Sequence, residues 1–179
     1  MTCIVGVEVE GKVVLAGDVL GSNGFNKNNY SQPKVFKHNN MIFGYTSTFR
    51  FGQVIQHHLD DLYPPETTDI SECFKWGVKV FVPKVNKVLK ETETEKGTML
   101  FGFNGLLWTL QNDSSILHSQ SGFASVGSGM YHAAGALDAY QRLGKMNTLN
   151  EAIDSLKQTI DIVGSNCTTV SKESVVMVL

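Results

Sequence analysis

Threonine occupies the second position of this chain, directly after the initiator methionine. Removal of Met1 would leave Thr2 with a side-chain hydroxyl and a free α-amine, so one residue could supply both a nucleophile and its general base. Such an amine titrates near neutral pH and can accept the hydroxyl proton directly or through water. Thr2 is therefore the first candidate for catalysis. A retained Met1 would silence it, because the base would become an amide.

Asp18 and Lys34 follow Thr2 at separations of 16 and 32 residues. Asp18 ends an apolar run at an Ala-Gly-Asp turn, and Lys34 follows Pro33 at the start of a predicted strand, so both side chains can converge at one sheet edge. A charged lysine held by an aspartate would lower the pKa of a nearby amine through like-charge repulsion and leave more of it able to accept a proton. The alternative is an ordinary surface ion pair, and these two residues alone do not decide between them.

Alternating apolar residues predict that strands open the chain. Residues 3–9 and 13–16 are expected to form a β-hairpin. Residues 21–31 are polar and rich in glycine and asparagine, so we expect a loop there. A second hairpin is predicted at residues 34–38 and 41–45. Four short strands therefore precede any helix.

Two helices are predicted next, over residues 49–62 and 69–90, because apolar side chains recur near the helical period. Pro83 is expected to kink or split the second one. Further strands are predicted at 98–103, 106–110, 123–126 and 174–179, and further helices at 128–143 and from the capping box Thr148-Leu-Asn-Glu151 onward. This order indicates antiparallel sheets with helices packed in pairs on their outer faces.

Length and composition indicate one domain covering residues 1–179, since the chain is 42% hydrophobic and only 18% charged. A formal charge of -2 without a basic stripe argues against nucleic acid and membrane surfaces as partners. The three cysteines, Cys3, Cys73 and Cys167, have neither zinc-site spacing nor an even count. With no signal peptide and no apolar run of membrane-spanning length, we expect a cytoplasmic protein.

Three motifs resemble ligand-binding motifs, but we do not expect any of them to bind a ligand. Residues 6–12 match a phosphate-binding loop until Val13 stands where a hydroxyl would hold magnesium. Gly127-Ser128-Gly129 lacks the third glycine of a dinucleotide fingerprint and is better explained as a helix entry. His57 and Asp61 lie one helical turn apart and could share a metal, but a solvated helix face is the better interpretation. No cofactor and no metal are therefore predicted.

Several of these residues, taken in their order along the chain, match the pattern of a known protein family. Thr2 before an alternating strand, Gly17-Asp18, Lys34-Val35 and Gly127-Ser128-Gly129 resemble the proteasome β-subunit family, and more closely its bacterial HslV-type peptidase members. The threonine-to-aspartate and threonine-to-lysine spacings match, and the order of elements extends the resemblance over nearly the whole chain. It implies an α+β fold, a four-layer α/β/β/α sandwich of two antiparallel sheets flanked by helix pairs, as in N-terminal-nucleophile hydrolases.

The resemblance also implies roles for individual residues. Thr2 would be the nucleophile with its own amine as base, Asp18 and Lys34 electrostatic supports, and Ser128 a hydrogen-bond partner of the amine. Asp161 resembles an aspartate that supports the nucleophile in the family.

A pocket for the substrate is implied as well. In the family, a backbone N–H from a glycine-containing segment stabilises the oxyanion, and the corresponding stretch here is residues 44–48, with Ser47 at the glycine position. Gly21, Phe36 and Tyr45 are expected to line the pocket for the side chain before the cleaved bond.

The function implied is a threonine peptidase that assembles into a homo-oligomeric ring and cleaves unfolded polypeptide inside a chamber. Because no nucleotide motif is present, a separate ATPase unfoldase ring is a plausible partner. Two alternatives stay open. One is a catalytically inert ring or scaffold subunit, motivated by Met1 and Ser47, and the other is a small-amide hydrolase of the same broad class.

Overall fold

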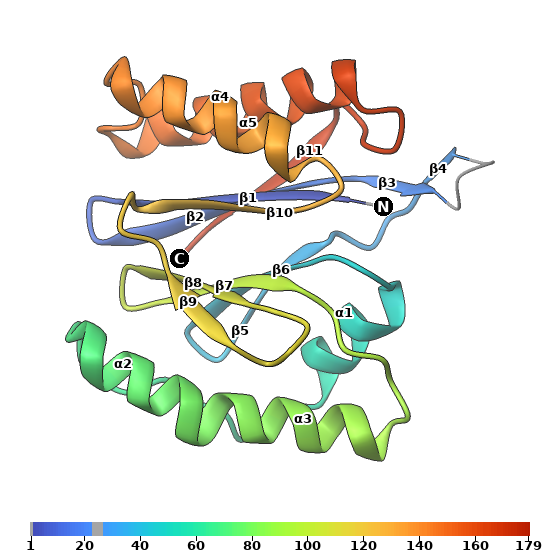
Figure 1. Cartoon of the computed structure of the whole chain (residues 1–179), viewed down its shortest axis with the longest axis vertical. Helices are drawn as coiled ribbons and strands as arrows, with labels where there is room; N and C mark the ends of the chain where they lie inside the picture. The colour runs from blue at the N-terminus through green and yellow to red at the C-terminus, as the bar shows by residue number, and fades with distance from the viewer. Residues whose placement is uncertain (1, 23–26) are drawn as a thin grey trace.

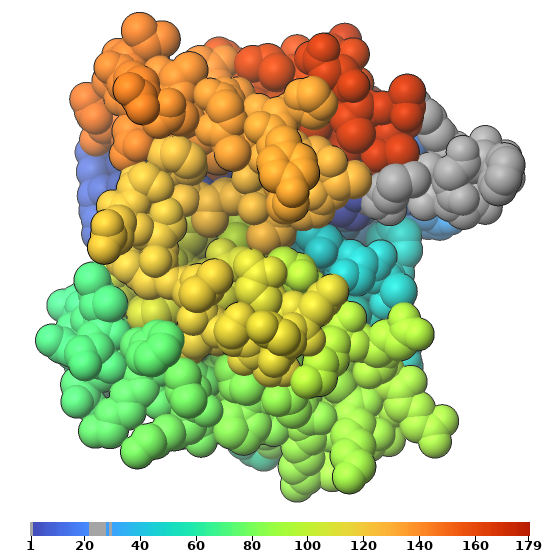
Figure 2. Space-filling model, viewed as in Figure 1, coloured from blue at the N-terminus to red at the C-terminus, as the bar shows by residue number. Residues whose placement is uncertain are grey.

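Two antiparallel β-sheets lie face to face, and each carries helices on its outer side (Figure 1). This is the four-layer sandwich predicted from the sequence. The computed structural model describes residues 2–22 and 27–179. In the space-filling view the two helical layers cover opposite ends of the molecule with the sheets between them (Figure 2).

The first sheet has four strands, and its register decides which residues meet at its end. The order is β10 (Phe123–Gly127), β1 (Cys3–Val9), β2 (Lys12–Asp18) and β11 (Ser174–Val178). Cys3 is paired with Gly127, and Ile4 with Gly17. The start of β1 therefore lies between the end of β10 and the end of β2, so Thr2, Asp18 and Ser128 come together at one edge.

The second sheet has five strands, in which tight turns join the first strand to the second and the third strand to the fourth. They run in the order β5 (Val35–His38), β6 (Met41–Tyr45), β7 (Met99–Phe103), β8 (Leu106–Leu110) and β9 (Ile116–His118). The turn residues Asn39, Asn40, Asn104 and Gly105 all have positive φ, as two-residue hairpin loops require. These hairpins were predicted, whereas the three-residue strand β9 was not.

The helices form one layer on each sheet. The five-stranded sheet is covered by α1 (Phe49–His57), α2 (Ile70–Trp76) and α3 (Val82–Glu91), and the four-stranded sheet by α4 (Met130–Arg142) and α5 (Leu149–Asn166). The predicted capping box of α5 is present, with Thr148 and Glu151 exchanging backbone and side-chain hydrogen bonds. No helix in the described ranges is long and apolar enough for a bilayer crossing.

Two local predictions were wrong. The segment expected to be a plain loop contains a short hairpin, β3 (Leu20–Ser22) with β4 (Lys27–Asn29). Helix α1 ends at His57, and the Asn39 side-chain amide instead donates to backbone carbonyls beyond it, at Asp60 and Leu62. At Pro83, where a kink or split was predicted, a π-helical segment, Gly77–Phe81, interrupts the α-helix just before the proline, and α3 continues through it.

The two sheets approach closely because glycines stand opposite bulky side chains. A Cβ at Gly102 on β7 would lie 2.6 Å from Cγ1 and 2.9 Å from Cβ of Val13 on β2. Val13 is fully buried in a core shared by both sheets, together with Ile4, Leu15, Val35 and Leu100. The inter-sheet distance therefore depends on the absence of a side chain at Gly102.

Gly102→Ala is expected to lower the free energy of unfolding by about 1–3 kcal/mol, because the added methyl overlaps a buried valine that has no free space. Urea unfolding of the two proteins measures the difference. Gly135→Ala is the matched control, since Gly135 is exposed on α4 and a Cβ there would meet no atom within 4 Å beyond its own stretch of helix, and alanine should stabilise that helix by about 0.5–1 kcal/mol. Equal effects of the two substitutions would contradict close sheet packing at Gly102.

Candidate active site

Thr2 lies at the start of β1 with 6% of its surface exposed. The neighbouring Gly127 has φ +99, and a Cβ there would overlap the carbonyl oxygen of Thr2. Glycine is therefore required at the end of β10 so that the following Ser128 can reach the first residues of the chain.

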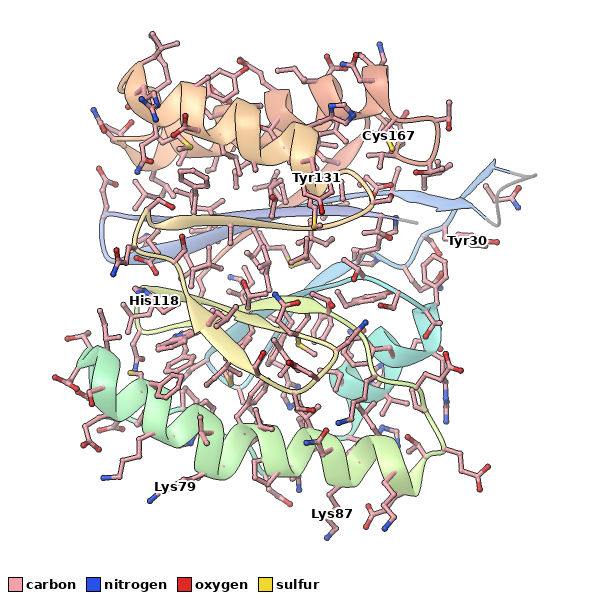
Figure 3. The ribbon with its side chains drawn as sticks, viewed as in Figure 1. Tyr30, Lys79, Lys87, His118, Tyr131 and Cys167 are labelled. Atoms are coloured by element: carbon pink, nitrogen blue, oxygen red, sulfur yellow. The ribbon has the colours of Figure 1, made fainter. Side chains whose placement is uncertain are left out.

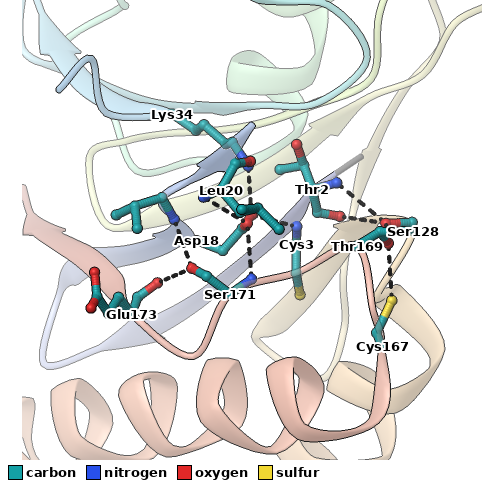
Figure 4. Close-up of polar contacts among 11 residues, drawn as sticks. Thr2, Cys3, Asp18, Leu20, Lys34, Ser128, Cys167, Thr169, Ser171 and Glu173 are labelled. Carbon is teal, nitrogen blue, oxygen red and sulfur yellow. Dashed lines mark hydrogen bonds and ion pairs between the residues drawn. The ribbon is translucent and has the colours of Figure 1, made fainter. Parts of the chain in front are cut away.

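The Asp18 carboxylate is the centre of a buried hydrogen-bond cluster (Figure 4). Its Oδ1 accepts from the backbone N–H of Cys3 at 2.9 Å and from Nζ of Lys34 at 2.8 Å. Its Oδ2 accepts from the backbone N–H groups of Leu20 at 3.2 Å and Ser171 at 3.4 Å. These donors come from four separate parts of the chain, so the carboxylate joins β1, the β2–β3 junction, the residue before β5 and the segment between α5 and β11.

Lys34 is 3% exposed and forms the only fully buried ion pair found in the described residues, with Asp18. Its Nζ also donates to the carbonyl oxygen of Leu20 at 2.5 Å. Burial lowers the pKa of Lys34, while the charge and hydrogen bond of Asp18 act in the opposite direction. The ammonium form of this lysine therefore depends on the carboxylate beside it.

Ser128 connects the backbone of Thr2 to the C-terminal part of the chain. The Thr2 nitrogen donates to Ser128 Oγ at 3.2 Å, and Ser128 Oγ lies 3.3 Å from the Thr2 carbonyl oxygen and 3.2 Å from Thr169 Oγ1. With Met1 attached, that nitrogen is a peptide N–H and can only donate. After removal of Met1 the same atom would be an amine, already placed against the Ser128 hydroxyl.

Two hydroxyl residues of this cluster were not predicted from the sequence. Thr169 contacts Ser128, and Ser171 donates its backbone N–H to Asp18 while its hydroxyl accepts from Val19. The three hydroxyl residues among positions 168–171, between the last helix and the last strand, were the available signal.

Asp161 is not brought into the cluster. It lies exposed on α5, and its backbone carbonyl accepts from Ser165 within the same helix. Among the described residues no hydrogen bond or ion pair of its carboxylate reaches Thr2, Lys34 or Ser128. We therefore leave Asp161 out of the candidate site.

Cys3 follows Thr2 but is not a competing nucleophile. Its side chain is fully buried, and this burial, with a smaller effect of the Asp18 charge, raises the pKa of the Cys3 thiol to about 12. The thiol is therefore neutral at physiological pH and packs as an apolar group.

A cavity of about 90 Å³ opens beside Thr2. It is lined by Thr2, Gly21, Lys34, Tyr45, Thr46, Ser47, Thr48 and Phe49. Three of the four residues predicted for substrate contact, Gly21, Tyr45 and Ser47, are in this lining. Phe36 is not, because it is buried behind Tyr45 and stacks on Phe43 with 5.2 Å between ring centroids. Phe49, which was not among the predicted substrate-contact residues, forms part of the wall.

Ser47 has the backbone conformation of a glycine, with φ +77. Its neighbours hold it there. The N–H and hydroxyl of Thr46 both donate to the carbonyl of Thr98, at 3.0 and 2.9 Å, and Thr48 caps α1 by accepting from the N–H of Phe51 at 3.1 Å. A left-handed serine costs about 1–2 kcal/mol, so this segment maintains strain next to Thr2.

A scan against protein-family models finds no match to the sequence, and a search of curated proteins finds none either. The structure does match solved structures over nearly the whole chain. The fold is that of the proteasome-like N-terminal-nucleophile hydrolases, which confirms the resemblance noted in the sequence at the level of fold.

Three of the similar structures illustrate the match. BPH of Thiobacillus denitrificans in complex with epoxomicin has a TM-score of 0.81 at 15% identity, covering 99% of this chain and 98% of that one. HslV of Trypanosoma brucei has a TM-score of 0.71 at 16% identity, covering 99% of both chains. The Anbu (Gly-1) mutant of Hyphomicrobium sp. strain MC1 has a TM-score of 0.73 at 14% identity, covering 100% of this chain and 81% of that one.

Asp18→Asn is expected to lower the free energy of unfolding by roughly 3–5 kcal/mol at pH 7, because it leaves a buried ammonium without its carboxylate. The loss should shrink towards high pH. The unfolded chain keeps the Lys34 proton up to the ordinary lysine pKa, whereas the folded variant releases it at a lower pH because burial lowers the Lys34 pKa. Between these two pKa values the unfolded state binds more protons, so the stability of the variant rises with pH.

Urea unfolding of variant and wild type at pH 7 and at about pH 9.5 measures this difference. Asp138→Asn is the control, since its partner Arg142 is exposed on α4 and water screens that pair, so little change is expected. A loss that is the same at both pH values would contradict a charged, buried Lys34.

Ser47→Gly is expected to raise the free energy of unfolding by about 0.5–1 kcal/mol, because glycine adopts positive φ without the steric cost of a Cβ. Ser165→Gly in α5 has a helical backbone instead and should lower it. Chemical denaturation of both variants tests the sign. Destabilisation by Ser47→Gly would show that the side chain, and not the backbone, matters for folding.

Proposed function

We propose that the chain is a threonine peptidase subunit in which Thr2, once Met1 has been removed, cleaves peptide bonds. The observation that carries this proposal is the meeting of Thr2, Lys34 and the cavity at one sheet edge, with Ser128 on the Thr2 nitrogen and Asp18 on Lys34. A nucleophile, a base on the same residue and a buried positive charge are the groups that acyl transfer requires.

In the proposed reaction, the Thr2 hydroxyl attacks the substrate carbonyl carbon and its proton passes to the Thr2 amine. The nearby Lys34 ammonium favours the unprotonated amine and stabilises the developing negative charge. The tetrahedral oxyanion would accept a hydrogen bond from the backbone N–H of Ser47, whose unusual conformation is compatible with that role.

Collapse of the tetrahedral intermediate breaks the C–N bond, and the leaving amine takes the proton back from the Thr2 amine. An ester between the substrate and Thr2 remains. Water then attacks this ester with the Thr2 amine as base, which releases the carboxylic acid and restores the hydroxyl.

We further propose a homo-oligomeric ring that acts on unfolded polypeptide, with an ATPase unfoldase ring as partner and the cytoplasm as location. The fold shared with HslV supports the assembly, and unpaired cysteines fit a reducing compartment. Residues 6–12, the stretch that resembled a phosphate loop, form the β1–β2 hairpin, so their backbone is paired between strands. Energy for unfolding substrates would therefore come from another protein.

A catalytically inert scaffold subunit is the second candidate. It applies if Met1 stays attached, since the Thr2 nitrogen is then an amide and has no base function. The third candidate, a small-amide hydrolase, would act without a closed ring and is separated from the others by light scattering.

Thr2→Ala is expected to reduce turnover of short fluorogenic peptides by roughly 10³-fold or more, because it removes the attacking oxygen. Intact-mass spectrometry must first show that the wild type has lost Met1. Epoxomicin, the ligand in the BPH structure, is expected to inhibit the wild type.

Thr68→Ala serves as the matched control, since Thr68 is an exposed threonine outside the cavity lining, and should leave turnover unchanged. A Met-free wild type that is no more active than Thr2→Ala would reject the peptidase and favour the scaffold.

A further inference from the structure

The cavity beside Thr2 is smaller than a cavity known to hold an aromatic ring. Its volume is about 90 Å³, whereas an apolar cavity of about 150 Å³ is known to hold benzene. The space therefore suits a side chain of a few methyl-sized groups.

Phe49 forms the aromatic part of the cavity wall together with Tyr45, and a second aromatic ring contacts it from the other side. Its ring meets Tyr30 edge-on, with 5.2 Å between centroids and 71° between planes, and meets Tyr45 in the same manner at 6.5 Å and 74°. Figure 3 shows Tyr30 beside the start of α1, the helix that begins at Phe49. Phe49 is thus packed between two aromatic rings and has little room to withdraw.

The two tyrosines are themselves restrained by glycines. Tyr45 is 5% exposed and lies against Gly52 of α1, where a Cβ would overlap its ring. Tyr30 lies against Gly21 in the same way, and Gly21 also lines the cavity. The rings of Tyr45, Phe49 and Tyr30 therefore lie in a row beside the cavity, with Tyr45 buried and Tyr30 46% exposed at the outer end.

Among the described residues, the lining offers no partner for a charged substrate side chain. Lys34 is the one charged residue among the eight in the lining, and its ammonium is already bound by Asp18 and the Leu20 carbonyl. A charged side chain would lose its hydration without gaining an ion pair.

We propose that Phe49 determines the specificity of this site, restricting the residue on the acyl side of the cleaved bond to small uncharged side chains such as alanine and valine. This inference rests on the peptidase function proposed above. The scissile carbonyl must reach Thr2, so the side chain of that residue enters the cavity that Thr2 and Phe49 share.

The test uses fluorogenic tripeptides that differ only in the last residue before the fluorophore, which is Ala, Val, Phe or Lys. The full-length, Met-free protein is expected to cleave the Ala and Val substrates with kcat/KM on the order of tenfold or more above the Phe and Lys substrates. Phe49→Ala removes the ring and should raise kcat/KM for the Phe substrate on the order of tenfold, while the Ala substrate changes by less than about threefold.

Phe74→Ala is the matched control. Phe74 is 46% exposed on α2 and lies outside the cavity lining, so the substrate preference should not change. Phe49→Leu is a milder variant that keeps an apolar residue against Tyr45, and it should shift the preference towards larger residues if Phe49→Ala does not fold.

The two proposals fail in different ways. Thr2-dependent turnover that is as fast for Phe as for Ala, or that Phe49→Leu and Phe49→Ala leave unchanged, would overturn the size limit and leave the peptidase intact. If no peptide is turned over, the peptidase proposal fails. The size limit is then tested by measuring how tightly the Thr2→Ala protein binds N-acetylated tripeptides that end in Ala or in Phe. Equal dissociation constants overturn the size limit, and tighter binding of the Ala peptide supports it.

Discussion

The buried ion pair between Asp18 and Lys34 is the interaction on which the rest of this site depends. Each charge loses several kcal/mol of hydration on burial, and the pair is tolerated only when its remaining hydrogen-bonding capacity is met. Here Asp18 accepts from Lys34 and from three backbone N–H groups, and Lys34 also donates to a carbonyl. Satisfying the pair therefore holds the chain segments around it in fixed positions, and Thr2 precedes one of the donors directly.

The sandwich places this cluster at one end and holds the sheets together at the other. At that opposite end, Oε1 of Glu8 on β1 lies 2.6 Å from the N–H of Leu107 and 2.9 Å from Nε2 of His118, both on the other sheet. His118 is labelled in Figure 3. Between these two polar contacts the sheets meet through apolar side chains that face glycines such as Gly102. The geometry at Thr2 is thus determined by packing along the whole sheet as well as by its own neighbours.

Local signals in the sequence predicted most of the fold because they act over a few residues. Asn104-Gly105 adopts the positive φ values of a tight hairpin, and Thr148 with Glu151 forms the capping box. The failures occurred where distant contacts override local preference. The end of α1 depends on the Asn39 amide from another hairpin, and β9 is too short to show a period of its own. The fold class came from the resemblance in residue order, which the structural neighbours then confirmed.

The same contrast between local signals and distant contacts applies to the candidate site. The sequence by itself determined that Thr2, Asp18, Lys34 and Ser128 have suitable chemistry and spacing, because residue type and separation are local facts. Only the tertiary structure decided that Thr169 and Ser171 join them and that Asp161 does not, since Ser171 lies 153 residues from the carboxylate it contacts. It also decided that Phe49 rather than Phe36 faces the cavity, because strand register and the packing of α1 set which aromatic ring is on the surface and which is behind it.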